Sequence, residues 1–125
     1  MAGTLVANTI NTDTGLFSTQ NAYQGIAKAW VQFSGSAPTI VGSFNITSIT
    51  KNGTGDFTAN FTTAMPNTGY AVTGMSGSPA SADTVCDFVA GSGTVTNTSG
   101  VRFGVRTLGG AYSDAAVICI SVFSS

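Results

Sequence analysis

The sequence contains no histidine and no glutamate, and it has few charged residues of any kind. Charged side chains make up 7% of its 125 residues, against about 25% in an average globular domain. Without histidine, the chain lacks the side chain that most often acts as a general base and as a transition-metal ligand. Its five acidic residues are all scattered aspartates. A carboxylate pair tuned for catalysis is therefore not expected, and we predict no catalytic residues and no enzymatic activity.

The shortage of charge also argues against several partners and cofactors. A formal net charge of −1 cannot neutralise phosphates, so no nucleic-acid binding is expected. No apolar run approaches the roughly 18 residues of a membrane helix, so we expect no membrane insertion. The N-terminus lacks the basic start and long apolar stretch of a secretion signal. The aspartates show no calcium-loop spacing, and we expect neither a metal nor a cofactor.

Cysteine is also scarce. Cys86 and Cys119 are the only two, and both lie in apolar runs. They could form one disulfide, but a framework of several disulfides is excluded. In a reducing cytoplasm two free thiols are expected instead. The sequence leaves the choice open.

Small polar residues and regularly spaced apolar residues are abundant. Thr, Ser, Asn and Gly fill 57 of the 125 positions, yet hydrophobic residues reach 42%, which is not the composition of a disordered chain. From Ile26 onward, apolar runs alternate with turn-forming residues at a spacing of roughly 8–12 residues, which predicts an antiparallel β-sandwich. We expect an all-β domain over residues 26–125 with about seven or eight strands in a jelly-roll or immunoglobulin-like arrangement. The expected strand runs are 27–33, 39–50, 56–63, 70–75, 84–90, 94–98, 101–108 and 115–123.

Alternation within these runs predicts which side chains are buried. Phe57, Ala59 and Phe61 alternate with polar residues, which is the period of a half-buried strand. The run 115–123 is apolar on both faces and is expected to be a central strand. Asn52-Gly53, just before the run at 56–63, predicts a hairpin turn.

The aromatic residues have two interpretations. So small a domain needs most of them in its core, and we expect Trp30, Phe88 and Phe103 to be buried along with the alternating phenylalanines. The alternative for Trp30 is a sugar-stacking surface, because an aromatic face suits a carbohydrate ring. For Arg102 and Arg106, which share one strand face, the alternatives are a solvated charged face and a contact for an acidic partner.

Residues 1–25 differ from the rest of the chain. Apolar residues are sparse there, and neither a helical nor a strand period is sustained. We expect an extended arm that is ordered by packing on another molecule. The side chains expected to serve anchoring or oligomerisation are Leu5, Val6, Ile10, Leu16, Phe17 and Tyr23.

The predicted strand faces are rich in Thr, Asn and Ser and poor in charge. Soluble monomers usually carry abundant charge of both signs, whereas charged residues are depleted at the core of subunit interfaces. We therefore predict a homo-oligomer to whose assembly the N-terminal arm contributes.

Three segments carry a resemblance to a known family. They are Ala27-Lys-Ala-Trp-Val-Gln-Phe33, the stretch 43–66 with its Asn-Gly-Thr-Gly-Asp-Phe-Thr and Thr-Ala-Met-Pro elements, and Tyr70-Ala-Val72. Together they resemble a module common in tailed bacteriophages. It occurs in proteins labelled tail fibre or virion structural protein, frequently in phages of cyanobacteria and other aquatic bacteria. Residues through Gly25 are similar to leaders in that group, and beyond Gly74 the resemblance is looser.

The resemblance implies a β-rich virion component, typically trimeric, that is assembled in the host cytoplasm. Because the chain has no shaft, we expect a short fibre or fibre tip. Its expected partners are itself as a homotrimer, other virion proteins of the tail, baseplate or capsid, and a host surface glycan or protein. The alternatives are a capsid decoration or cement protein or a head fibre, and, from another class, a carbohydrate-binding module. The residues expected in receptor-facing loops are Ser34, Ser36, Asn52, Thr54, Ser78 and Ser81.

Overall fold

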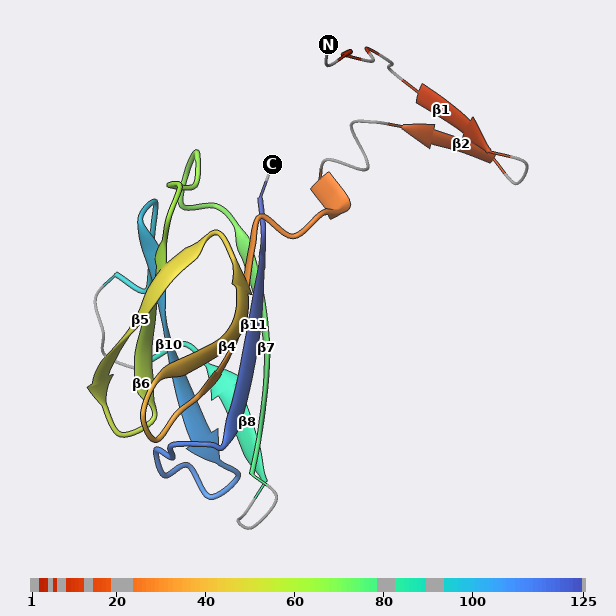
Figure 1. The fold of residues 1–125 in the computed structure, drawn as a ribbon. Helices are drawn as coiled ribbons and strands as arrows, with labels where there is room; N and C mark the ends of the chain where they lie inside the picture. Colours follow the sequence, from red (N-terminus) through yellow and green to blue (C-terminus); the bar gives the residue numbers. More distant parts are fainter. Residues whose placement is uncertain are drawn as a thin grey trace.

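The chain folds into two antiparallel sheets that face each other as a β-sandwich (Figure 1). The computed structural model describes residues 3–4, 6, 9–12, 15–18, 24–78, 83–89 and 94–124. The all-β architecture confirms the predicted fold class. The strands are β1 (Thr9–Thr12), β2 (Gly15–Ser18), β3 (Ala29–Ser34), β4 (Thr39–Phe44), β5 (Ile46–Gly53), β6 (Asp56–Phe61), β7 (Ala71–Gly77), β8 (Thr84–Asp87), β9 (Thr96–Asn97), β10 (Gly100–Thr107) and β11 (Val117–Phe123).

Each sheet of the sandwich mixes strands from distant parts of the sequence. The four-stranded sheet has the order β4–β3–β11–β7. The five-stranded sheet has the order β5–β6–β10–β8, with the short β9 also paired to β10. β11 lies between β3 and β7, so its central position is as predicted.

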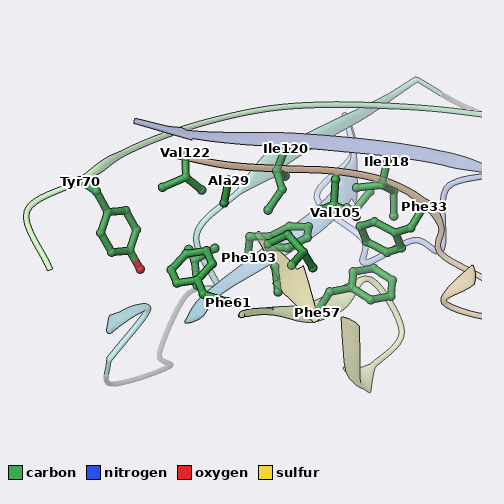
Figure 2. Packing of buried hydrophobic residues seen from close by; sticks show 14 of the residues in the cluster. Ala29, Phe33, Phe57, Phe61, Tyr70, Phe103, Val105, Ile118, Ile120 and Val122 are labelled. Atoms are coloured by element: carbon green, nitrogen blue, oxygen red, sulfur yellow. The ribbon is translucent and has the colours of Figure 1, made fainter. Parts of the chain in front are cut away.

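The core lies between the sheets, where three phenylalanine rings meet (Figure 2). Phe33 from the four-stranded sheet stands edge-on to Phe57, with 5.2 Å between ring centroids, and lies 6.1 Å from Phe103. Phe57 and Phe103 come from neighbouring strands of the opposite sheet, and their centroids are 6.0 Å apart. Such edge-to-face contacts are favourable beyond the area that they bury.

The alternation read from the sequence matches the burial of β6. Phe57, Ala59 and Phe61 are buried, whereas the residues between them are only partly covered. The same holds for the apolar positions of β10, including Phe103. These expectations are confirmed because a strand alternates its side chains between the core and the outer face.

The expected single run 39–50 is in fact two strands in different sheets. The chain crosses over at Asn45, whose φ of 54° lies in the left-handed region that asparagine tolerates. The Asn45 amide nitrogen donates to the carbonyls of Lys28 (3.0 Å) and Thr63 (3.1 Å), and its Oδ1 accepts from the Thr63 N–H at 2.7 Å. Asn45 is therefore the corner that joins the two sheets at this end.

The β5–β6 hairpin forms as predicted, but its turn lies two residues later. β5 continues through Asn52-Gly53, and the chain reverses at Thr54-Gly55. Gly55 has a φ of 63°, and a Cβ at this position would lie 2.4 Å from the Val105 carbonyl oxygen. Only glycine fits this turn, because both its conformation and the space beside it exclude a side chain.

The expectation that Trp30 and Phe88 are buried is wrong. Trp30 is 42% exposed because it points away from the core, opposite in direction to its buried neighbours Ala29 and Val31. Phe88 is 50% exposed because it follows the end of β8 and is not held between the sheets.

The arm expected over residues 1–25 contains a hairpin. β1 pairs antiparallel with β2, and Ile10 lies opposite Phe17 while Asn11 lies opposite Leu16. Val6 is exposed. Leu5 and Tyr23 lie outside the described residues.

We predict that Phe57→Ala lowers the free energy of unfolding by about 3–5 kcal/mol, because it removes the ring that contacts both Phe33 and Phe103. Phe88→Ala is the matched control, with an expected loss of about 1 kcal/mol, since that ring is half exposed. Urea unfolding measures both. Equal losses would contradict the placement of the core.

Candidate functional site

The loops predicted to face a receptor gather at one end of the sandwich. Antiparallel pairing brings together the β3–β4 loop, the β5–β6 turn and the β10–β11 loop, with Ser78 after β7 and Asp83 before β8. In Figure 1 this end lies opposite the C-terminus. We call it the loop end, and it comprises residues 34–38, 52–55, 78, 83 and 108–116.

One ion pair connects three of these loops. The Lys51 ammonium donates to Oδ2 of Asp114 at 2.6 Å, and also to the carbonyl oxygens of Gly35 (3.2 Å) and Ser36 (3.0 Å). The other carboxylate oxygen of Asp114 accepts from the N–H of Gly55 at 2.8 Å. About 29% of the Lys51 side chain and 24% of the Asp114 side chain remain exposed, so the pair lies at the surface of the loop end. The pair therefore acts as a clamp, and each of its charges has hydrogen-bonding partners.

Backbone hydrogen bonds add to this clamp. The Gly35 N–H donates to the Ala115 carbonyl at 2.9 Å. The Leu108 N–H donates to the Asp83 carbonyl at 3.2 Å, which ties the residue before β8 to the β10–β11 loop. The loop end is thus cross-linked by its own polar groups, so it presents a preformed surface.

The structure brings most of the predicted loop residues together. Ser36 and Thr54 are exposed, and the Ser34 and Ser36 hydroxyls lie 3.4 Å apart. Asn52 has a structural role, because its amide donates to Oγ1 of Thr58 at 2.9 Å. Ser78 is half-buried at the end of β7. Ser81 lies outside the described residues.

Sequence reasoning missed the β10–β11 loop as part of this surface. Residues 108–116 contribute Asp114 to the clamp and place Leu108 in solvent. The adjacent glycines at 109–110, which precede an apolar run, were the available signal of a loop. Their position at the loop end could not be read from the sequence, because it depends on the pairing of β10 and β11 with other strands.

Arg102 and Arg106 lie on the outer face of the five-stranded sheet, where each pairs with an aspartate. Arg102 donates to both carboxylate oxygens of Asp56, at 2.9 and 2.6 Å. The Arg106 Nε lies 3.1 Å from Oδ2 of Asp87, and its guanidinium lies over the Tyr112 ring at 4.4 Å. An acidic partner would therefore have to displace an internal carboxylate from either arginine.

The Asp56 carboxyl is affected most strongly by its arginine partner. The hydrogen bonds from Arg102 lower the pKa of Asp56 below its usual 3.8, and they outweigh the opposite effect of burial. The carboxylate form is therefore the one that the folded protein favours.

Cys86 and Cys119 are free thiols. Cys86 lines a cavity of about 330 Å³ between the sheets, beside Val72, Gly74 and Phe103. Burial raises the pKa of the Cys86 thiol, so it remains protonated and is a weak nucleophile at neutral pH.

The loop end is suited to binding through shape and hydrogen bonds. Among the residues that the structure describes, no three His, Cys, Asp or Glu side chains are grouped so that they could hold a metal ion. Within the same ranges, no helix has the length and apolar character that a membrane span requires. The chain matches no protein-family model, no curated protein and no solved structure.

We predict that Asp114→Ala lowers the free energy of unfolding by about 1–3 kcal/mol, because Lys51 and the Gly55 N–H lose their acceptor. Proteolysis within residues 108–116 should become faster. Asp83→Ala, an exposed aspartate at the same end, should change stability by less than about 0.5 kcal/mol. Urea unfolding and limited proteolysis measure these effects. A neutral Asp114→Ala would disprove the clamp.

We predict a pH-dependent effect of Asp56→Asn. Because the pKa of Asp56 is lowered in the folded state, its contribution is fully present above about pH 4 and is lost as the pH falls through the folded value. The variant should therefore be less stable than the wild type at pH 7, and the difference should shrink below pH 3. Arg102→Gln should show the same trend. Urea midpoints at both pH values test this, and a constant difference would contradict it.

Proposed function

We propose that this chain is a structural protein of a bacteriophage virion, a trimeric short fibre or fibre tip that contacts the host surface through the loop end. The observation that carries the proposal is the difference between the two ends of the sandwich. The C-terminus and the entry into β3 lie at one end, and the hydrogen-bonded loop end lies at the other (Figure 1). Such an arrangement suits a protein that is attached at one end and binds at the other.

The attachment end is defined by backbone pairing. Ala29 at the start of β3 is the register partner of Val122 near the end of β11, and the Lys28 N–H donates to the Val122 carbonyl at 2.7 Å. Residues 1–25, with the β1–β2 hairpin, precede this point. Attachment of these residues to the particle would direct the loop end outward.

The chemistry of the loop end fits binding without catalysis. Its exposed groups include the hydroxyl residues Ser36 and Thr54 and the apolar side chain of Leu108. Three copies would present three such surfaces, and simultaneous weak contacts add avidity without any new contact. A host glycan or surface protein is the partner that we propose.

The phage resemblance supports the same function. The resembling residues 27–72 form β3 to β6 and the start of β7, and they include the Asn45 corner and the Gly55 turn. These positions carry strong structural constraints, so the module is a scaffold for the loops. A capsid decoration protein would use the same scaffold with the particle shell as its partner.

A carbohydrate-binding module is the second candidate, and the exposure of Trp30 favours it. The indole lies on the outer face of β3, opposite Phe44 in the register with β4. Aromatic faces of this kind can stack on sugar rings. This function would place the ligand on a sheet face and not on the loop end.

An antibody against this protein should label the tail of the phage that encodes it, and purified protein should compete with particles for adsorption to host cells. We expect Thr54→Lys at the loop end to compete about tenfold less well, a loss of about 1.4 kcal/mol in binding. Thr68→Lys, at an exposed position at the opposite end, is the matched control and should compete like the wild type.

Three results would count against this proposal. Labelling confined to the head would disprove the tail location and favour a decoration protein. Equal competition by both variants would disprove binding through the loop end. Turnover of host polysaccharide by the purified protein would disprove a role in binding alone.

A further inference from the structure

Charge is divided unequally between the two sheets. The strands of the five-stranded sheet contain five charged residues, whereas β4, β3, β11 and β7 contain none. Lys28 lies one residue before β3, at the end of this sheet. The outer side of the four-stranded sheet therefore has no charge along its strands. The charged strand residues of the other sheet are Lys51, Asp56, Asp87, Arg102 and Arg106.

Large apolar side chains project from this charge-free side. Met75 is 78% exposed on β7, and Val41, the extra residue at a bulge in β4, is 72% exposed. Trp30, Phe44 and Val117 are also exposed. We call the exposed side chains of these five residues the uncharged face. They come from all four strands, so the face extends across the whole sheet.

Cross-strand register places the side chains of the uncharged face near one another, with Ser121 and Cys119 of β11 between Trp30 and Met75. Phe44 is the partner of Trp30, which in turn is the partner of Ser121 on β11. Met75 is the partner of Cys119. Side chains directly opposite in antiparallel strands are in contact distance, about 4.5–5.5 Å between Cβ atoms. Monomeric proteins rarely expose apolar patches of this kind without a partner.

Gly42 leaves space for the Trp30 ring on the uncharged face. A Cβ on Gly42 would lie 3.4 Å from the six-membered ring of Trp30, so the indole covers the place where a side chain would stand. The Trp30 ring therefore lies beside Gly42 of β4, whose neighbour in the chain is the exposed Val41. The aliphatic side chains that project beside the Trp30 ring can pack against the ring of a second copy.

We propose that the uncharged face is where copies of this chain associate. The inference relies on the proposed function only for the number of copies, three. Four strands about 4.8 Å apart, each about six residues long, span roughly 20 by 20 Å, or about 400 Å² per copy. Three such faces turned toward one threefold axis bury about 1,200 Å² in all, or about 400 Å² between each pair of copies, below the roughly 1,200 Å² of a standard pairwise interface, so association through this face alone is concentration dependent.

The chemistry of the face favours a second copy over other partners. A charged partner would find no strand residue to pair with, and its charges would be desolvated without compensation. The strands of a second copy's four-stranded sheet also carry no charged residue, so no charged strand residue loses its hydration when the two faces meet. The ion-paired face on the other sheet keeps its hydration, which explains why one sheet faces a neighbour and the other faces water.

Sedimentation velocity of the full chain over about 1–100 µM tests this inference. We expect the wild type to approach three times the monomer mass of 12.5 kDa. Met75→Lys should raise the dissociation constant at least about 100-fold, because the ammonium would be buried without a partner. Val41→Lys, on a different strand, should do the same. Val85→Lys replaces an exposed valine of the other sheet and should retain the wild-type mass.

Thermal unfolding of each variant checks that it is folded, and the three substituted positions are exposed and lie on three different strands. Cys119, the register partner of Met75, gives a second signal. Its alkylation, followed by peptide mass spectrometry, should be slow in the oligomer and faster in Met75→Lys.

Several results would decide the inference. A wild type that stays monomeric at 100 µM, or lysine variants on the uncharged face that keep its mass, would overturn it. A monomer whose Trp30 fluorescence shifts with oligosaccharide would overturn it in favour of a glycan surface. A mass twice that of the monomer, lost in Met75→Lys, would support the interface and overturn the trimer. None of these measurements depends on finding the protein on a particle, so the virion location is tested separately and only the number of copies is shared by the two proposals.

Discussion

The structure depends on the contact between the two sheets, which is made by inward-facing apolar side chains. Phe33 of one sheet meets Phe57 and Phe103 of the other, with centroids 5.2 and 6.1 Å apart. The two sheets have separate hydrogen-bonded ladders, so burial of apolar surface is what holds them face to face. Each fully buried ring contributes about 1.5–3 kcal/mol. A chain with so little charge needs this contact to orient its loops and outer faces.

The few charges are used where loops and strands must be fixed. Lys51 and Asp114 join three loops, and Arg102 with Asp56 joins neighbouring strands of one sheet. Each of these ions has a partner, which limits the cost of covering it. The other sheet has no charge in its strands and exposes apolar side chains instead. The few charged residues thus cross-link the loop end, and their absence from the other sheet leaves a face suited to a second copy of the chain.

These features fit together in the proposed virion protein. The loop end is preformed, the chain enters at the opposite end, and the uncharged face lies along the side of the sandwich between them. Copies packed by that side would hold their loop ends in one direction. Binding would then be multivalent, which compensates for the modest contacts that hydroxyl-rich loops can make. Shape and association, and not bond chemistry, would carry the function.

The sequence by itself determined the all-β class and the buried positions of β6, because alternation at period two is a local property of a strand. It could not show that Asn45 moves the chain from one sheet to the other, or that Trp30 points outward, since both depend on which strands become neighbours. The loop residues were named from the sequence, but their common end and the Asp114 clamp were not. Only the tertiary structure decided these, because antiparallel pairing of strands far apart in the sequence determines which loops meet.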